Sequence, residues 1–388
     1  MRLFLLEPHA PGPAWAPFTG VRPIAELRAG IWKIRERWEA ALDLETEAIL
    51  GEHSAHFHEG FEPPCRHGLT VEGPAIIAAS WFAPTGAPLT PGPGIRRLVH
   101  GRETVGWVVP AGATWTAPTS GGDALDVEGL LLRGTFDLVT ALDTYLAADC
   151  LGFRAGPADP VPNGSLILGD PALVLCRGAL VEPGVMFDTR KGAVVVEAGA
   201  EVRFGTRLEG PLYVGERSRI VGDALRHTVI GPRCTVRGEV SNSVFLGYAN
   251  KAHDGFLGHS VVGHWANLGA GTTTSNLKNT YGEVTLVVGD KKIGTGRQFL
   301  GSLIGDHAKT AIGTMLATGT VVGAGANVFG RGQVPKYVPP MAWGIEGERM
   351  TEEGFLGVAG RVMPRREVAL TDERRAALQA TWRRLTAS

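Results

Sequence analysis

A histidine and an aspartate stand side by side at His253 and Asp254, within a stretch that runs from Asn250 to Asn279. The unperturbed pKa of histidine is near ~6.5, so its imidazole can accept a proton at neutral pH as a general base. Further along, the segment Gly269–Thr272 has no bulky side chain, so its backbone N–H groups are candidate donors to an oxyanion. Taken alone, however, a histidine in such a polar stretch is more often a solvated loop residue.

The composition is that of an ordinary globular protein. The 388 residues contain 38 Lys+Arg against 39 Asp+Glu, which gives a formal net charge of -1. This balance offers no electrostatic reason to bind nucleic acid or an anionic membrane. The four cysteines form neither a CxxC pair nor a disulfide framework, so we expect a reduced, cytoplasmic protein. We also expect no signal peptide and no membrane-spanning segment, because every apolar run is too short.

Residues 1–155 are expected to form an α/β domain. Leu3 to Leu6 predict a first buried strand, and Gly73 to Phe82 predict another. Apolar residues from Ile24 to Leu42 recur at helical spacing, which predicts one helix there. Thr135 to Cys150 predict a helix that closes the domain.

The periodicity changes after residues 156–164, whose prolines and glycines predict a linker. Over residues 165–333, aliphatic residues recur every six positions, and glycine often follows them directly. The first unbroken run is Val196, Val202, Leu208, Val214 and Ile220. A period of six is typical of a hexapeptide β-helix, in which each aliphatic residue stacks on its equivalent one coil away. We expect roughly nine coils of about eighteen residues each.

The six-residue pattern is broken twice, at residues 241–256 and 274–292. Insertions in a solenoid usually leave it as loops on one face, which is often the binding face. Residues 334–388 are expected to be a separate tail. Its residues 371–386 predict a helix with Thr371 as the N-cap, which we expect to pack on the solenoid or on a neighbouring subunit.

The segment "KAHDGFLGHSVVGHWANLGAGTTTSN" resembles the acetyltransferase half of the bifunctional glucosamine-1-phosphate acetyltransferase / N-acetylglucosamine-1-phosphate uridylyltransferase family. That family has a Lys-Ala-Gly-His-x-x-Tyr-Leu-Gly segment, then Asn-Ile-Gly-Ala-Gly-Thr and a further Asn. The matching residues are Lys251, His253, Leu257, Gly258, Asn267, Gly269, Ala270, Gly271, Thr272 and Asn276. The resemblance implies a left-handed parallel β-helix that follows a shortened nucleotidylyltransferase-like α/β domain. It also implies a homotrimer whose sites are shared between neighbouring subunits.

The stretch "APFTGVRPIAEL" is similar to the Pro-Leu-Thr-x-x-x-Pro-Lys stretch of sugar-phosphate nucleotidylyltransferases. Active members of that group carry a glycine-rich loop after the first strand, whose N–H groups hold the triphosphate. Here "EPHAPGPAW" follows the first strand, and its three prolines have no N–H to donate. Nucleotidyl transfer, with the Mg²⁺ it would use, is therefore an alternative and not the expected activity. Arg22 and Arg28 are expected to be surface charges, with phosphate binding as the alternative.

The resemblance implies that His253 is the general base of a CoA-dependent N-acyltransferase, with acetyl-CoA as cosubstrate. Phe256 stands where the family has a tyrosine, so one substrate hydrogen bond is missing. The implied substrate-binding residues are Lys251, Phe256, Asn267 and Arg219, with Arg226 or Arg237 as alternatives to Arg219. The implied cofactor-binding residues are Ala270, Gly271, Asn276 and Thr295.

The other histidines receive plainer interpretations. His259, His264 and His307 fall at or near hexapeptide corners, so we expect them to be structural. A cluster near the N-terminus fits no standard zinc spacing, so we expect a polar loop there and no metal site. That cluster is His53, His56, His58, Cys65 and His67.

The expected activity is acylation of the amine of an amino-sugar phosphate such as glucosamine-1-phosphate, most simply with an acetyl group. This reaction belongs to sugar-nucleotide or cell-envelope precursor metabolism, such as UDP-N-acetylglucosamine biosynthesis. Two alternatives remain: nucleotidyl transfer by the first domain, and a non-catalytic scaffold that binds a sugar nucleotide.

Overall fold

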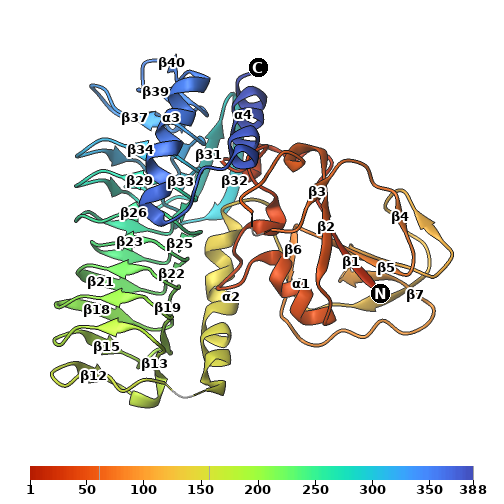
Figure 1. The fold of residues 1–388 in the computed structure, drawn as a ribbon, viewed down its shortest axis with the longest axis horizontal. Coiled ribbons are helices and arrows are strands. Elements are labelled where there is room, and N and C mark those ends of the chain that lie inside the picture. The colour runs from red at the N-terminus through yellow and green to blue at the C-terminus, as the bar shows by residue number, and fades with distance from the viewer. Residues whose placement is uncertain (61, 157, 388) are drawn as a thin grey trace.

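In a computed structural model, the chain forms an α/β domain, a long parallel β-helix and a C-terminal arm of two helices (Figure 1). The structure describes residues 1–60, 62–156 and 158–387. None of the helices in these ranges is long and apolar enough to cross a membrane. The helices are α1 (Ile34–Leu42), α2 (Asp137–Gly152), α3 (Glu352–Val362) and α4 (Asp372–Thr386).

A seven-stranded mixed sheet forms the centre of the α/β domain, in the order β10-β7-β8-β5-β1-β2-β3. The central strand β1 pairs in parallel with β2 and β5, and its buried apolar residues confirm the predicted first strand. The strands are β1 (Arg2–Leu6), β2 (Thr46–Leu50), β3 (Cys65–Arg66), β5 (Ala75–Ala79), β7 (Ile95–His100), β8 (Glu103–Val109) and β10 (Asp123–Asp126). Two short pairs complete the domain: β4 (Val71–Glu72) with β9 (Thr114–Trp115), and β6 (Phe82–Pro84) with β11 (Gly129–Leu131).

The single helix predicted from Ile24 to Leu42 is wrong. Only a 3-10 turn, η2 (Ile24–Glu26), and α1 are helical there. Between them Arg28 and Lys33 form an antiparallel bridge around Gly30, whose φ of 73° lies in the left-handed region. This reversal returns Lys33 to the buried carboxylate of Glu26, so the apolar spacing reflects a buried turn and not a helix.

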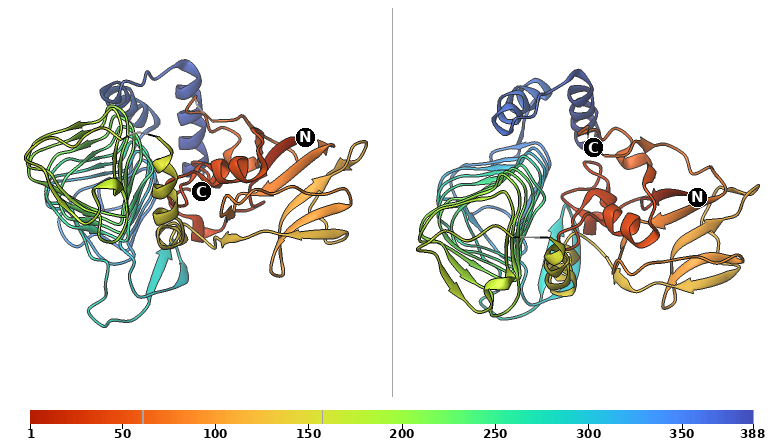
Figure 2. Two further views of the ribbon diagram at one scale, coloured as in Figure 1. Left: turned by 90° about the horizontal axis from the view of Figure 1, so that it is seen from below. Right: turned by 60° about the horizontal axis from the view of Figure 1, so that its bottom comes forward.

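Three flat parallel sheets make the sides of the β-helix, and Figure 2 shows the coils superposed in a triangular outline. Face 1 consists of β12 (Leu166–Leu168), β15 (Met186–Asp188), β18 (Thr206–Glu209), β21 (Asp223–Arg226), β24 (Val240–Ser241) and β27 (Leu257–Gly258), and β30 (Thr273–Thr274) and β35 (Met315–Leu316) continue that side. Face 2 consists of β13 (Val174–Cys176), β16 (Val194–Val196), β19 (Leu212–Val214), β22 (Val229–Ile230), β25 (Val244–Phe245), β28 (Val261–Val262), β33 (Leu303–Ile304), β36 (Val321–Val322) and β38 (Tyr337–Val338). Face 3 consists of β14 (Leu180–Val181), β17 (Glu201–Val202), β20 (Arg219–Ile220), β23 (Thr235–Val236), β26 (Asn250–Lys251), β29 (Asn267–Leu268), β34 (Lys309–Thr310), β37 (Asn327–Val328) and β39 (Ala342–Trp343), with β40 (Glu348–Arg349) added antiparallel.

The inward columns confirm the predicted stacking. On face 2, for example, Val196 pairs with Val214 and Val214 with Ile230, and all three side chains are fully buried. Each coil alone cannot bury its apolar side, so the ladder of coils is what makes the fold stable. The predicted parallel β-helix is confirmed.

The two predicted breaks have different outcomes. After β30 the chain does leave the coil, forms a hairpin of β31 (Val284–Val288) and β32 (Lys291–Arg297), and returns at β33. In Figure 2 this hairpin projects beside α2. Residues 241–256 do not leave the coil, because β25 and β26 pair with the strands on both sides. The first break is thus a change of corner length and not an insertion.

The C-terminal arm closes the far end of the β-helix and also reaches the α/β domain. Thr371 caps α4 as predicted, its hydroxyl accepting the N–H of Arg374 at 3.3 Å. Met341 and Phe355 belong to an apolar cluster against which Trp382 of α4 packs. The Arg374 side chain donates to the Glu59 carbonyl of the first domain at 2.6 and 2.9 Å.

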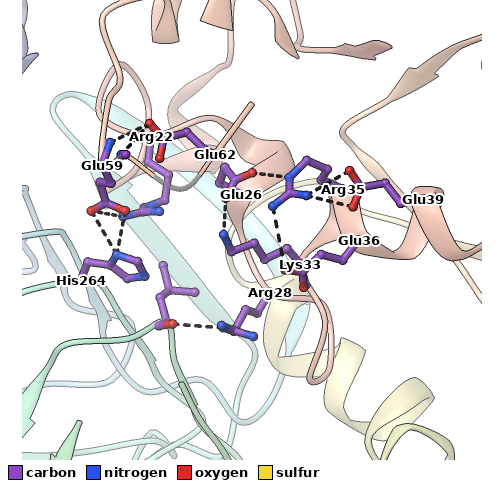
Figure 3. A network of polar contacts seen from close by, with 12 residues as sticks. Arg22, Glu26, Arg28, Lys33, Arg35, Glu36, Glu39, Glu59, Glu62 and His264 are labelled. Carbon is purple, nitrogen blue, oxygen red and sulfur yellow. Dashed lines mark hydrogen bonds and ion pairs between the residues drawn. The ribbon is translucent and has the colours of Figure 1, made fainter. Parts of the chain in front are cut away.

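A buried ionic network joins the α/β domain to the β-helix (Figure 3). Arg22 was expected on the surface, but it is 1% exposed, and this expectation is wrong. Its Nε donates to Asp306 at 2.9 Å and its Nη2 to Glu59 at 3.0 Å. The second oxygen of Asp306 accepts the N–H of His264 at 2.9 Å. Glu59 also accepts the indole N–H of Trp265 at 3.2 Å.

The carboxylate of Glu59 is held ionised. Burial by itself raises the pKa of Glu59, but Arg22 and His264 together bring that pKa well below its usual range. Burial lowers the pKa of His264, with Arg22 as the next cause, so its neutral Nδ1 can donate to Glu59 at 3.0 to 3.1 Å. Removing the single cation would therefore leave buried negative charge without compensation.

We expect Arg22→Met to lower the free energy of unfolding by about 3–5 kcal/mol, because Glu59 and Asp306 lose their shared cation. Chemical denaturation followed by tryptophan fluorescence measures this change. The matched control is Arg217→Met, which breaks a pair with Glu367 whose side chains are 59% and 70% exposed. The control should leave the free energy of unfolding nearly unchanged, because solvent screens an exposed pair. Equal, small effects of both variants would show that the network does not hold the domains together.

Candidate active site

His253 lies at the corner where the chain turns from face 3 to face 1, between β26 and β27. Its side chain and that of Asp254 are exposed. The corner is packed against the coils on either side. A Cβ on Gly238 would lie 2.5 Å from the Gly255 carbonyl, and one on Gly255 would lie 2.3 Å from the Thr272 carbonyl. The backbone that carries His253 is therefore fixed, while its imidazole faces solvent.

Lys251 occupies a position where the coils on either side have an aliphatic residue. It pairs with Val236, in a column that the next coil continues with Leu268, and it is 1% exposed. Its Nζ donates to the carbonyls of Arg237 and His253, both at 2.9 Å. Burial lowers the pKa of this amine to about 8. The structure therefore turns Lys251 inward, where its amine holds the His253 corner.

The next coil stacks Ala270 and Gly271 above the His253 corner. Their neighbours are engaged: the N–H of Gly269 bonds the Thr310 hydroxyl at 3.0 Å, and that of Thr272 bonds the Gly269 carbonyl at 3.1 Å. Within the described residues, the N–H groups of Ala270 and Gly271 have no protein acceptor. These two are thus the donors of the segment that remain free for a ligand.

Asn276 and Phe256 lie together over face 1. A Cβ on Gly258 would meet the Asn276 Nδ2 at 2.7 Å and the Phe256 ring at 2.5 Å. The Asn276 Nδ2 donates to Nδ1 of His259 at 2.9 Å, and the His259 ring stacks on Phe299 at 5.3 Å. The three predicted residues His253, Phe256 and Asn276 therefore belong to one side of the solenoid.

The sequence did not indicate that His259 would contact a predicted site residue. Burial lowers its pKa to about 4, so at neutral pH it is an uncharged acceptor for the Asn276 amide. It was expected to be structural, yet it orients a residue assigned to the cofactor. One cue was available: His259 follows His253 by one hexapeptide, so the two occupy the corners of one side of a coil.

The remaining predicted residues are dispersed. Asn267 lies on the outer side of face 3, where its Oδ1 accepts from Asn250 at 2.8 Å. Arg219 is on the same face but three strands away, and its Nε bonds Glu201 at 3.1 Å. Thr295 is buried in the hairpin, where its hydroxyl donates to the Val284 carbonyl at 2.6 Å. The alternatives to Arg219 are also paired: Arg226 with Glu239 at 2.5 Å, and Arg237 with Asp223 at 3.1 Å.

The histidine cluster near the N-terminus serves packing contacts. His53 Nε2 bonds the His9 carbonyl at 2.8 Å, and its Nδ1 meets Arg384 of α4 at 3.1 Å. Burial lowers the pKa of His56 to about 4. Over the described part of the chain, no group of three or more His, Cys, Asp or Glu side chains is placed to hold a metal ion.

In the first domain, a buried carboxylate directly after β1 accepts hydrogen bonds from two backbone N–H groups. Glu7 accepts the N–H groups of Ile24 at 2.8 Å and Ala25 at 3.1 Å. Burial raises the pKa of Glu7 to about 7. The adjoining cavity of about 320 Å³ is lined in part by Glu7, Pro8 and Trp81.

Comparison with known proteins agrees with both halves of this architecture. Residues 6–86 match the family model described as sugar nucleotidyl transferase. The chain is 36% identical over 143 residues to the bifunctional sugar-1-phosphate nucleotidylyltransferase/acetyltransferase of Sulfurisphaera tokodaii, a match that covers 36% of each chain. The chain is therefore similar to bifunctional nucleotidylyltransferase/acetyltransferases. The resemblance expected from the sequence is thereby confirmed.

Two further relatives carry the name bifunctional protein GlmU. That of Methanococcus vannielii is 34% identical over 86 residues, which is 22% of this chain and 20% of the relative. That of Synechococcus elongatus is 24% identical over 258 residues, which is 66% of this chain and 46% of the relative. The matched part of this chain thus spans less than half the length of each of these three relatives.

The buried amine of Lys251 leads to a pH-dependent stability. Its pKa is about 8 in the folded state against an ordinary value of 10.5, so from pH 8 to 10.5 the unfolded chain binds more protons. The contribution of Lys251 to the free energy of unfolding should therefore rise over this window, while the buried cysteine thiols, whose pKa values are raised by burial, act in the opposite direction. We expect the free energy of unfolding of the wild type, relative to that of Lys251→Met, to increase from pH 8 to 10.5 by up to about 3 kcal/mol, as measured by denaturant unfolding at several pH values.

The control for this experiment is Lys292→Met, on the exposed hairpin strand β32. It should show the same pH dependence of stability as the wild type. If Lys251→Met shows that same pH dependence as well, the Lys251 amine is not deprotonated more easily in the folded state.

Proposed function

We propose that the chain is a CoA-dependent N-acyltransferase, acting with acetyl-CoA on the amine of an amino-sugar phosphate such as glucosamine-1-phosphate. Residues 165–333 would be the acyltransferase domain. The observation that carries the proposal is the stack of two corners: His253 on one coil, with the free N–H groups of Ala270 and Gly271 on the next. The names of the relatives, which include an acetyltransferase, support it.

The chemistry follows from what these groups can do. The acceptor amine attacks the thioester carbonyl, and His253 takes the proton that the nitrogen loses as the C–N bond forms. The N–H groups of Ala270 and Gly271 stabilise the negative oxygen of the tetrahedral intermediate. The C–S bond then breaks, and the proton held by His253 neutralises the departing CoA thiolate. The products are the amide and free CoA.

The neighbouring residues would position the two substrates. Phe256 offers an apolar ring to the sugar, without the hydroxyl of the tyrosine in the resembling family. Asn276 is oriented by His259 at 2.9 Å and would line the thiol arm of the coenzyme. Asn267 would bond the acceptor from face 3. Lys251 acts through the backbone, because its Nζ holds the carbonyl of His253 at 2.9 Å.

Nucleotidyl transfer by the first domain is the second candidate, favoured by the match of residues 6–86 to sugar nucleotidyl transferases. The geometry at the end of β1 argues against turnover. A loop that held a triphosphate would need free N–H donors there. The N–H groups of Ile24 and Ala25 are instead bonded to Glu7. A sugar-nucleotide scaffold without catalysis is the remaining alternative.

We expect wild-type protein to release CoA thiol from acetyl-CoA in the presence of glucosamine-1-phosphate. His253→Ala should lower kcat about 10²–10⁴-fold, because general-base catalysis is lost. A thiol-reactive dye measures the rate. Asp254→Asn is the matched control on the same exposed corner, and its rate should stay near that of the wild type.

The outcomes separate the candidates. If the rate of thiol release is unchanged in His253→Ala but falls in His259→Ala, the general base would be His259, at the other corner of this side. Binding of CoA without turnover would exclude glucosamine-1-phosphate as the acceptor. Absence of both turnover and CoA binding would favour the non-catalytic scaffold that binds a sugar nucleotide.

A homotrimer would share the site between neighbouring subunits. The corner that stacks above Ala270 and Gly271 carries Ile312, which is 83% exposed, and Met315 nearby is 69% exposed. Apolar side chains this open are typical of an interface. We expect Ile312→Glu to dissociate a trimer that light-scattering mass measurement detects in the wild type. Leu151→Glu on α2, where Leu151 is 46% exposed, is the control. A wild-type protein that is only monomeric would contradict the shared site.

A further inference from the structure

A basic cleft lies on face 3, where the chain that follows α3 crosses the ladder of strands. Its volume is about 250 Å³. Three cationic side chains line it, Lys309 from β34 and Arg365 and Arg366 from the arm. Among the described residues that line it, none is an aspartate or a glutamate. The function described above uses none of these three cations.

The three cations lack the partners that other basic residues on this face have. Arg219 pairs with Glu201, and Arg233 pairs with Glu367. Within the described part of the chain, no ion pair includes Lys309, Arg365 or Arg366. Among the described residues, the Lys309 Nζ donates only to the His307 carbonyl, at 2.8 Å, and Arg366 Nη2 donates to Asn250 Oδ1 at 3.2 Å.

The pKa values agree with an absence of negative charge. Burial lowers the pKa of Lys309 to about 8, with no carboxylate to oppose it. Burial also lowers the pKa of Arg366, and the charge of neighbouring Arg365 acts in the same direction. Three like charges in one cleft repel one another, and a bound anion would remove that repulsion.

Hydrogen bonds fix the orientation of the two asparagine side chains that line the cleft. An arginine can only donate, so its bond to Asn250 fixes the oxygen of that amide toward Arg366. The Asn250 Nδ2 must then face Asn267, which presents its oxygen at 2.8 Å. This leaves the Nδ2 of Asn267, which also lines the cleft, as a donor with no acceptor among the described residues. The stacked rings of Tyr248 and Trp265, 4.4 Å apart, form a further wall.

We propose that this cleft binds a phosphate group, held by Lys309, Arg365, Arg366 and the Nδ2 of Asn267. Arginine forks and a lysine ammonium are the donors suited to phosphate oxygens. His253 follows Asn250 by three residues, so its Cα lies at most about 11 Å from that of Asn250. A phosphate in the cleft would therefore anchor a ligand beside the His253 corner. That link rests on the proposed acyl transfer, whereas phosphate binding by itself does not.

Two ligands of the proposed reaction could supply the phosphate: the acceptor sugar phosphate, and the phosphorylated adenosine end of CoA. Titration calorimetry of the full-length protein with inorganic phosphate, glucosamine-1-phosphate and adenosine 3′,5′-diphosphate distinguishes them. Arg365→Gln/Arg366→Gln should weaken binding of inorganic phosphate and of one of the two organic ligands about tenfold or more. The organic ligand that loses affinity identifies the source of the phosphate.

The matched control is Arg361→Gln, an exposed arginine on the same arm that does not line the cleft. It should bind all three ligands as the wild type does. Lys309→Met tests the cleft independently, from its solenoid wall. Arg365→Gln alone changes an exposed side chain, so a loss of binding in this variant cannot be attributed to misfolding. Unchanged affinity in the double variant, or no binding of any of the three ligands to the wild type, would overturn the proposal. Phosphate binding that is lost in the variants would sustain it even if no acyl transfer were found.

Discussion

The parallel, in-register ladder of the β-helix is the constraint on which the rest of the structure depends. Each coil must place its strands directly above those of the coil before it, so corners stack on corners. That rule brings Gly271 above the corner of His253, and Asn267 beside Asn250. Residues far apart in the chain are thereby fixed next to each other by backbone bonds alone. The candidate site needs no dedicated scaffold, because the ladder already positions its parts.

Lys251 is a charged residue in a largely apolar column of the ladder, and it lies at the site. Lys251 replaces an aliphatic residue between Val236 and Leu268, at a cost in buried charge. Its amine recovers part of that cost from two corner carbonyls, including that of His253. Sequences usually break their own local pattern where function requires it. The histidine side chain stays exposed while the backbone beneath it is tied to the core.

The contact between the domains depends on a single arginine side chain. Arg22 contributes one guanidinium to Glu59 of its own domain and to Asp306 of the solenoid, and Arg374 of the arm bonds the Glu59 backbone. Three parts of the chain thus meet at one buried charge cluster, of which Figure 3 shows Arg22, Glu59 and His264. The arm held there also carries Arg365 and Arg366 across face 3. Docking of the first domain and the composition of the basic cleft are therefore linked through the arm.

The sequence by itself determined the β-helix, because a period of six aliphatic residues can be buried only by stacking coils. It also determined the His253 motif and the capped helix α4, since both depend on local spacing. It did not determine the turn around Gly30, where a left-handed residue reverses a stretch with helical spacing. Only the tertiary structure decided the burial of Arg22, the inward turn of Lys251 and the place of His259. Those depend on partners from distant coils and domains, and a linear pattern carries no information about such contacts.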